Sequence, residues 1–236
     1  MSGLKAVIFD FDGTLVQLRP GPGKMDELRE RLGVLFAEVG IRSTLRPFYP
    51  EVDRALAALR HLDDGQRTRV WSEAVALIEQ YELEFSRSSE PCPHAAETWK
   101  AVASRFPCAV ASSNMRLTIQ RALSRHGIWD ARTSVPFVGF EDVERHKPDP
   151  ASLLRLAEEL RLDPGDLAAH VGDHVSDLEA CRAVNRRGGA HLVAITVQGG
   201  KCRWEDVVAH PGFHPSRGIA DLSQLLPLLE SGAYSR

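Results

Sequence analysis

The sequence lacks the features of several classes of protein. Its four cysteines show neither a CxxC spacing nor histidine partners at zinc-finger intervals, which argues against a disulfide framework and a structural zinc site. The apolar stretch near the N-terminus is broken by Asp10 and is too short for a signal-peptide core or a membrane span. We therefore expect a cytoplasmic protein with no membrane partner and with free thiols at Cys92, Cys108, Cys181 and Cys202.

An excess of charge of one sign is also lacking. The net charge at pH 7 is −3, and the basic residues are scattered among acids, so nucleic acid is not an expected partner. Hydrophobic residues make up 43% and charged residues 26%, as in ordinary soluble globular proteins. The 236 residues suffice for one large domain or for a core domain with a smaller insert. A monomer and a homodimer both remain open.

The most informative stretch is the first apolar segment and the loop after it. Leu4–Phe9 predicts a strand buried on both faces of a parallel sheet, and it ends at Asp10 and Asp12. Two carboxylates two positions apart can point the same way, and their repulsion separates their proton affinities unless a cation screens both. Gly13 permits a sharp turn close to a ligand, and Thr14 adds a hydroxyl. The alternative is a strand that merely ends in exposed aspartates.

Two further segments place polar groups between a predicted strand and a helix. The strand Cys108–Ser112 leads into Ser113 and Asn114, just before a helix over Arg116–Arg125. The carboxyl end of a strand is where doubly wound sheets bind ligands, although a Ser-Asn pair is also a common helix cap. Lys147 precedes two prolines, which are expected to hold the chain extended ahead of a helix beginning at residue 151. A lysine fixed there can clamp a phosphate, although most lone lysines are solvated surface residues.

A second pair of acids follows another predicted strand. Leu167–Val171 is apolar, and the loop after it carries Asp173 and Asp177, four positions apart. Magnesium prefers oxygen ligands and is usually held by one or two carboxylates together with phosphate and water. Asp10 and Asp173 therefore predict a magnesium site, with Asp177 orienting the ligands. We interpret His174 as a loop residue because histidine is a poor magnesium ligand.

A helical region separates the first strand from the rest. Apolar residues recur at three- and four-residue spacing, with Leu28, Leu32, Leu35, Phe36 and Val39 forming one stripe. Turns are expected at Pro47–Pro50 and Asp63–Gly65. We predict a helical cap domain over residues 19–90, and an α/β core domain over residues 1–18 and 91–236. The alternative is that these helices only pack on the core. The predicted helices are Met25–Val39, Glu51–Leu62 and Arg69–Phe85.

The remaining pattern alternates strands and helices. This order predicts an α/β fold with a doubly wound, Rossmann-like parallel sheet that has helices on both faces. The further predicted elements are a helix over Ala95–Arg105, a strand end at Phe137–Phe140, a helix over Ala151–Leu162, a strand over His191–Val197 and a short helix over Leu222–Leu229.

Together these segments resemble the haloacid dehalogenase-like (HAD) superfamily, whose members are mostly phosphatases. The signature opening matches Asp10-Phe11-Asp12-Gly13-Thr14-Leu15, the second motif matches Ser113, the third Lys147, and the fourth Gly172-Asp173-His174-Val175-Ser176-Asp177. The helical insert after the first motif is similar to the C1-type cap of the phosphoglycolate phosphatase-like and β-phosphoglucomutase-like branch.

The resemblance implies a role for each matched residue. Asp10 would attack phosphorus and become an aspartyl-phosphate, and Asp12 would protonate the leaving alcohol and then deprotonate water. Ser113, Lys147 and Mg²⁺ would absorb charge on the transferring phosphoryl group. The implied phosphate-binding residues are Gly13, Thr14, Ser113, Asn114 and Lys147, and the implied metal-binding residues are Asp10, Asp12 through its backbone carbonyl, Asp173 and Asp177.

The implied function is Mg²⁺-dependent hydrolysis of a small phosphorylated metabolite. Dehalogenation is not expected, because dehalogenases of the family lack an acid at the position of Asp12. Sugar-phosphate mutase activity stays open, since it uses the same core residues. A phosphate- or metal-binding module without turnover is a further alternative, since a fold alone does not establish a function.

Overall fold

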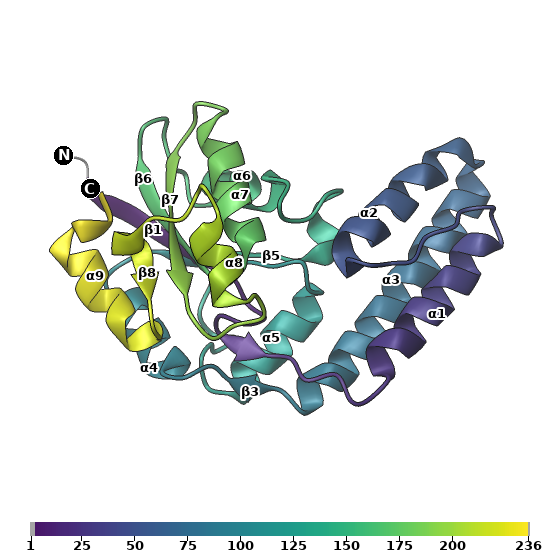
Figure 1. Cartoon of the computed structure of the whole chain (residues 1–236), viewed down its shortest axis with the longest axis horizontal. Coiled ribbons are helices and arrows are strands. Elements are labelled where there is room, and N and C mark those ends of the chain that lie inside the picture. Colours follow the sequence, from purple (N-terminus) through teal and green to yellow (C-terminus); the bar gives the residue numbers. More distant parts are fainter. Residues whose placement is uncertain (1–2, 236) are drawn as a thin grey trace.

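The protein consists of a parallel sheet covered by helices and a lobe of helices beside it (Figure 1). The structure, a computed structural model, describes residues 3–235. The six strands are parallel and follow the order β5-β4-β1-β6-β7-β8, so the first strand lies inside the sheet. They are β1 (Leu4–Phe9), β4 (Cys108–Ala111), β5 (Phe137–Val138), β6 (Leu167–Gly172), β7 (His191–Val197) and β8 (Gly218–Ile219).

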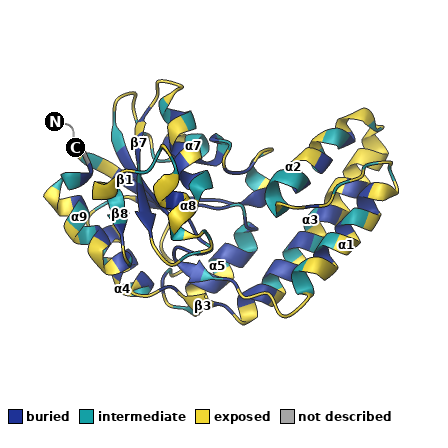
Figure 2. Cartoon of the chain, viewed as in Figure 1, coloured by how far each residue is buried: buried dark blue, intermediate teal, exposed yellow. Residues whose placement is uncertain are grey.

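Both faces of the central strand are buried, because alternate residues point to opposite sides. Val7 and Phe9 belong to the large apolar cluster that includes Trp99, whose ring centroid lies 5.3 Å from that of Phe9. Ala6 and Ile8 belong to a second cluster on the other face. The first face is covered by α4 (Ala95–Ala103), α5 (Arg116–Arg125) and α9 (Leu225–Ser231), and the second by α6 (Ala151–Glu159) and α7 (Val175–Asn185). This α/β, Rossmann-like architecture is the predicted fold class, and Figure 2 shows its strands buried.

The helical lobe is built on amphipathic helices. It contains α1 (Lys24–Ala37), α2 (Phe48–Ala58) and the long α3 (Asp64–Arg87). Leu28, Leu32, Leu35 and Phe36 of α1 are buried, as their spacing predicts, whereas Val39 lies beyond the helix and is partly buried. α1 packs on α3, and α3 continues against α5. The short antiparallel strands β2 (Val16–Gln17) and β3 (Glu90–Pro91) pair where the chain enters and leaves the lobe.

Three local predictions were wrong. Pro47–Pro50 is not a turn, because α2 begins at Phe48 and Pro50 lies in its first turn. N–H groups in the first turn of a helix have no acceptor within the helix, so a proline there costs no hydrogen bond. Asp63–Gly65 is also not a turn, since the Asp63 carboxylate accepts the Gln66 N–H at 2.9 Å and α3 begins at the next residue. Residues 147–150 are not extended, because the Asp149 N–H donates to the His146 carbonyl at 2.9 Å and closes a turn.

The C-terminal part differs in detail from its prediction. The predicted helix over Leu222–Leu229 is a 3₁₀ turn, η4 (Leu222–Gln224), followed by α9. The other elements are α8 (Trp204–Ala209) and the 3₁₀ turns η1 (Leu59–His61), η2 (Phe140–Asp142), η3 (Pro215–Arg217) and η5 (Ala233–Ser235). The four cysteines are free, as predicted. Within residues 3–235, no helix combines the length and the apolar character that crossing a membrane requires.

Candidate active site

Four charged side chains from distant parts of the sequence meet at the carboxyl edge of the sheet. Asp10 follows β1, Asp173 follows β6, Asp177 lies in the first turn of α7, and Lys147 comes from the turn before α6. The Lys147 ammonium Nζ lies 2.5 Å from Asp10 Oδ1 and 2.6 Å from Asp177 Oδ1. All four side chains are buried, with at most 8% of any residue exposed. The parallel arrangement brings these groups together because it gathers the ends of β1 and β6 at one edge.

Burial and mutual repulsion set the charges of this cluster. Burial raises the pKa of Asp10 to about 7, and the neighbouring Asp177 and Asp173 act in the same direction, against the Lys147 ammonium. Burial also raises the pKa of Asp173 to about 6. Burial acts to raise the pKa of Asp177 as well, but Lys147 and His170 hold it well below its ordinary range. Three carboxylates therefore share one ammonium group, which leaves an excess of negative charge in a buried site of low dielectric constant.

This excess fits a divalent cation. One carboxylate oxygen from each of Asp10, Asp173 and Asp177 lies within 4.8 Å of the others, and all three residues are buried. Hard oxygen donors of this kind suit Mg²⁺, and a cation would favour the ionised forms that burial disfavours.

Asp173 sits in a close-fitting socket. A Cβ on Gly13, whose φ is +105°, would lie 2.6 Å from Asp173 Oδ2, and one on Gly200 would lie 2.0 Å from the same atom. The Thr14 hydroxyl donates to Asp173 Oδ1 at 3.3 Å, and the Lys201 N–H donates to Oδ2 at 2.5 Å. The two glycines are required because only a residue without a side chain lets the backbone approach the carboxylate this closely.

Gly13 and Thr14, two of the implied phosphate-binding residues, belong to this socket. The Gly13 N–H donates to the Val16 carbonyl at 2.8 Å, and Thr14 is fully buried with its hydroxyl on Asp173. The tight loop uses both donors internally, and the Thr14 hydroxyl orients Asp173, a candidate metal ligand.

Asp12 is held beside a lysine that the sequence reasoning missed. Its Oδ1 accepts the Leu18 N–H at 2.8 Å and lies 3.1 Å from the Lys201 Nζ. Burial raises the pKa of Asp12, while Lys201 opposes the shift. Lys201 follows a Gly-Gly break after β7, and that break was the available signal for a loop that turns back toward the site.

His170 is a second residue that was missed. Its Nε2 lies 2.9 Å from Asp177 Oδ1 and its Nδ1 lies 3.1 Å from the Ile8 carbonyl oxygen. Both partners are acceptors, and the contact with Asp177 fixes the orientation of that carboxylate. The residue lies within β6 and is fully buried. A polar residue inside a buried strand requires hydrogen-bond partners, and this was the sequence signal that could have identified His170.

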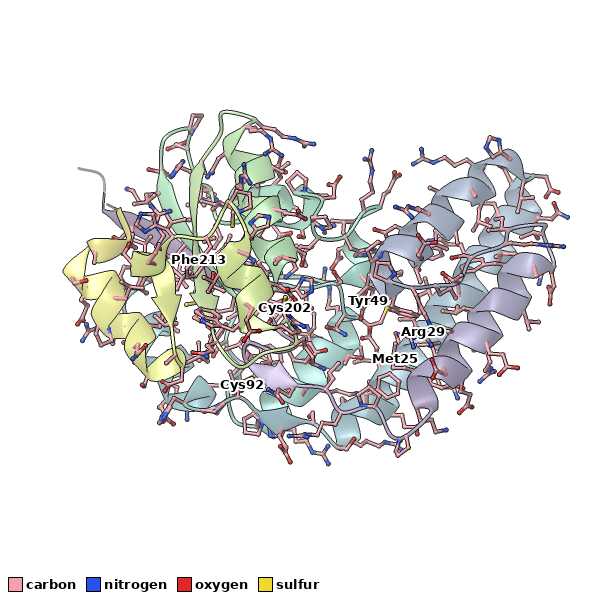
Figure 3. All side chains as sticks on the ribbon, viewed as in Figure 1. Met25, Arg29, Tyr49, Cys92, Cys202 and Phe213 are labelled. Carbon is pink, nitrogen blue, oxygen red and sulfur yellow. The ribbon has the colours of Figure 1, made fainter. Side chains whose placement is uncertain are left out.

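The loop after β4 is joined to the helical lobe. The Asn114 side chain donates to the Tyr49 hydroxyl at 2.8 Å and accepts from the Ser112 hydroxyl at 3.0 Å. The Tyr49 hydroxyl donates to Glu82 Oε1 at 2.7 Å, and Glu82 Oε2 accepts the Met115 N–H at 2.8 Å. Tyr49 lies where the lobe meets the α/β part (Figure 3). Sequence reasoning missed this connection, because Tyr49 was assigned to a turn and Glu82 was simply part of a predicted helix.

A cavity of about 480 Å³ opens onto these groups. Ser113 lies in its wall beside Asn114, and Lys147 lies at its base with Asp10. The lobe contributes Pro47, Phe48, Tyr49 and Pro50 to the wall, and the core contributes residues including Asp12, Asp173, Asp177, Glu179 and Lys201. The size and the convergent charges suit a small phosphorylated ligand.

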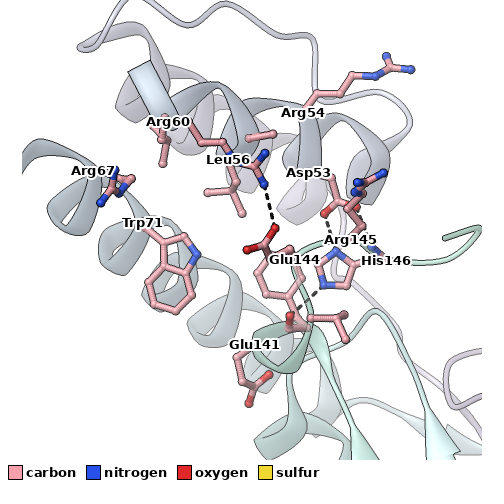
Figure 4. A pocket seen from close by; sticks show the side chains of 14 residues that line it. Asp53, Arg54, Leu56, Arg60, Arg67, Trp71, Glu141, Glu144, Arg145 and His146 are labelled. Carbon is pink, nitrogen blue, oxygen red and sulfur yellow. Dashed lines mark hydrogen bonds and ion pairs between the residues drawn. The ribbon is translucent and has the colours of Figure 1, made fainter. Parts of the chain in front are cut away.

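A second cavity of about 580 Å³ lies between α2, α3 and the segment after β5 (Figure 4). His146 connects the two sides there, since its N–H donates to Asp53 Oδ2 at 2.8 Å and its Nε2 lies 2.9 Å from the Phe140 carbonyl oxygen. Arg60 spans the same gap to Glu144 at 2.8 Å. None of Asp10, Asp12, Asp173 and Asp177 lines this cavity, so we assign the chemistry to the smaller one.

Comparisons with known proteins agree with this arrangement. Residues 4–185 match the model of the haloacid dehalogenase-like hydrolase family. The chain is 30% identical to a phosphoglycolate phosphatase of Rhodospirillum rubrum over 190 residues, which is 76% of each chain.

Solved structures show the same fold. A protein of Bacteroides fragilis described as a haloacid dehalogenase-like hydrolase is similar with a TM-score of 0.64 and 21% identity, over 94% of this chain and 99% of that one. A protein of Thermotoga maritima described as a β-phosphoglucomutase has a TM-score of 0.57 and 20% identity, over 97% and 99%.

Proposed function

Since this chain belongs to the haloacid dehalogenase-like hydrolase family, we propose that it hydrolyses the phosphate monoester of a small metabolite through a phosphoryl group carried on Asp10, with Mg²⁺ as cofactor. It is a phosphatase of that family. The observation that carries the finer proposal is the buried cluster in which Lys147 Nζ lies 2.5 Å from Asp10 Oδ1, with Asp173 and Asp177 beside it.

The first step is a displacement at phosphorus. The Asp10 carboxylate attacks, the bond to the alcohol oxygen breaks, and the Asp12 carboxylic acid gives its proton to that oxygen. A raised pKa suits Asp12 to this role, because the acid form persists closer to neutral pH. In the second step a water molecule loses a proton to the Asp12 carboxylate and attacks the phosphorus, which releases phosphate and regenerates Asp10.

Charge on the transferring group is balanced by fixed donors. Lys147, held between Asp10 and Asp177, and the Ser113 hydroxyl at the cavity wall face the position of the phosphoryl oxygens in this proposal. Bound Mg²⁺ would supply further positive charge beside those oxygens. Asp10, Asp173 and the Asp12 backbone carbonyl would hold it, and Asp177 would orient the ligands together with His170.

We also propose that residues 19–90 act as a cap domain over a core of residues 1–18 and 91–236. The support is that α1, α2 and α3 form a separate lobe, and that this lobe supplies one wall of the cavity through Phe48 and Tyr49. A closed cap excludes water and strengthens the electrostatic interactions at the reacting group.

The test is Mg²⁺-dependent release of phosphate from 4-nitrophenyl phosphate and from a panel of metabolite esters. The panel includes 2-phosphoglycolate, because the Rhodospirillum relative is a phosphoglycolate phosphatase. Asp10→Asn is expected to abolish turnover while the circular dichroism spectrum is unchanged, and Glu73→Gln on the exposed surface of the lobe is the matched control. Unchanged activity in Asp10→Asn would show that another group is the nucleophile. Transfer of phosphate to a second sugar hydroxyl, instead of release, would indicate a mutase.

A further inference from the structure

We propose that the leaving-group side of the active cavity selects phosphate esters of uncharged, apolar or aromatic alcohols and rejects those whose alcohol carries a carboxylate. The inference rests on the proposed function, since the leaving oxygen is placed beside Asp12. Phe48 and Tyr49 are the residues that would set this preference.

The wall that the lobe presents to the cavity is apolar. It consists of Pro47, Phe48, Tyr49 and Pro50, from the start of α2. The rings of Phe48 and Tyr49 meet edge to face, with centroids 5.1 Å apart at 72°. Phe48 is half-buried, so part of its ring remains available to a ligand. Edge-to-face aromatic surfaces of this kind favour apolar and aromatic groups.

The Tyr49 hydroxyl already has one acceptor and one donor as partners. It donates to Glu82 and accepts from Asn114, at 2.7 and 2.8 Å. Glu82 is 2% exposed and is itself held by the Met115 N–H. A phenol fixed by these two partners presents its ring to the cavity and keeps its one proton for Glu82, so a substrate carboxylate finds no donor there.

The two lysines of the cavity wall also have hydrogen-bond and ion-pair partners. Lys147 pairs with Asp10 and Asp177, and Lys201 donates to the Leu18 carbonyl at 2.9 Å and lies 3.1 Å from Asp12. The wall also contains His174.

His174 is held within its own loop, where its Nδ1 accepts the Ser176 N–H at 3.1 Å. With Asp12 in its acid form, the cavity has two ammonium groups against the four carboxylates of Asp10, Asp173, Asp177 and Glu179. Bound Mg²⁺ and a phosphate dianion cancel each other's charge, so a further carboxylate on the substrate would meet net repulsion.

Three arginines of the lobe line the other cavity. Arg54, Arg60 and Arg67 line the space shown in Figure 4 and are absent from the wall of the active cavity. Aromatic groups stand between the two spaces, since the Tyr49 ring lies 6.3 Å from that of Phe140 and 6.2 Å from that of His146. The lobe therefore carries cations that a carboxylate could use, but not on the side where the leaving group lies.

The decisive experiment compares two esters that differ by one carboxylate, phenyl phosphate and 4-carboxyphenyl phosphate. We expect kcat/KM to be at least ~10-fold higher for phenyl phosphate, since discrimination by one unpaired charge reaches this size or more. In the same assay 2-phosphoglycolate is expected to be a poorer substrate than ethyl phosphate. Comparable or higher kcat/KM for the carboxylated members would overturn the inference while leaving the proposed phosphatase function intact. Absence of turnover with all four esters would refute the proposed function, and this inference with it.

Substitutions of Phe48 test whether this residue sets the preference for apolar leaving groups. Phe48→Leu is expected to lower kcat/KM for phenyl phosphate by ~5- to 10-fold, and Phe48→Arg to reverse the order of the two aryl esters. Val34→Ala, an apolar truncation on the exposed side of α1, is the matched control and is expected to change neither value. If both Phe48 variants retain the wild-type order and values, Phe48 does not form the leaving-group wall, and that part of the inference fails.

Discussion

Replacing the proposed nucleophile is expected to stabilise the metal-free protein at alkaline pH. Asp10 has a pKa of about 7 in the folded state, raised mainly by burial, against 3.8 for an ordinary aspartate. A carboxyl whose folded pKa is raised stabilises the fold at low pH, and this contribution is lost as pH rises through the folded pKa. Asp10→Asn replaces the acid by a neutral group of similar shape, so it removes this pH dependence.

The magnitude follows from the two pKa values. Between pH 5 and pH 8, ionisation of Asp10 is expected to cost the wild-type protein about 2–3 kcal/mol of unfolding free energy that the variant does not lose. The variant should therefore be somewhat more stable than the wild type at pH 5, and its advantage should be larger by this amount at pH 8. For a chain of this size the difference in melting temperature is then expected to widen by about 5–10 °C between the two pH values.

Mg²⁺ is expected to narrow the difference in stability between the two proteins at pH 8. At about 100 times its dissociation constant, a ligand that binds only the folded state stabilises it by about 2.7 kcal/mol. Wild-type protein should gain this stability at pH 8, because the cation favours the ionised carboxylates. Asp10→Asn should gain much less, since it lacks one of the three clustered carboxylates.

The assay is urea unfolding followed by circular dichroism at pH 5, 6.5 and 8, with EDTA and with Mg²⁺. Glu73→Gln serves as the control for loss of an exposed carboxylate, and should follow the wild type at every pH. The reasoning is refuted if metal-free Asp10→Asn is less stable than the wild type at pH 8, or if the difference between them does not change with pH.

Three further variants probe the rest of the site. Lys147→Met removes the ammonium that contacts Asp10 and Asp177, and kcat/KM for an aryl phosphate is expected to fall by ~100-fold or more; a loss below ~10-fold would contradict its proposed role. His170→Asn removes the donor to Asp177, and the Mg²⁺ concentration that gives half-maximal activity should rise by ~10-fold, whereas a merely structural histidine would lower the melting temperature and leave that titration unchanged. Gly200→Ala brings a Cβ within 2.0 Å of the Asp173 carboxylate, so isothermal titration should show weakened Mg²⁺ binding; unchanged affinity would mean that this close approach relaxes without moving Asp173.

The sequence determined the alternation of strands and helices and the polar residues at the strand ends. Leu4–Phe9 is apolar apart from Lys5, a pattern typical of a strand buried on both faces, and β1 lies inside the sheet. Because parallel strands end at one edge, the separate positions of Asp10 and Asp173 in the sequence were enough to predict that they meet. The apolar stripe at three- and four-residue spacing likewise predicted α1, and Leu28, Leu32, Leu35 and Phe36 of that stripe are buried.

Only the tertiary structure decided which neighbours each polar group has. Nothing local to Thr14 indicates that its hydroxyl turns to Asp173, and nothing local to Tyr49 indicates that Glu82 and Asn114 hold it. Lys201 reaches Asp12 across 189 positions of the chain, a contact that no periodicity encodes. Hydrophobic patterning records which face of an element is buried, whereas the partner of a buried polar group depends on how distant elements pack, and the fold alone fixes that.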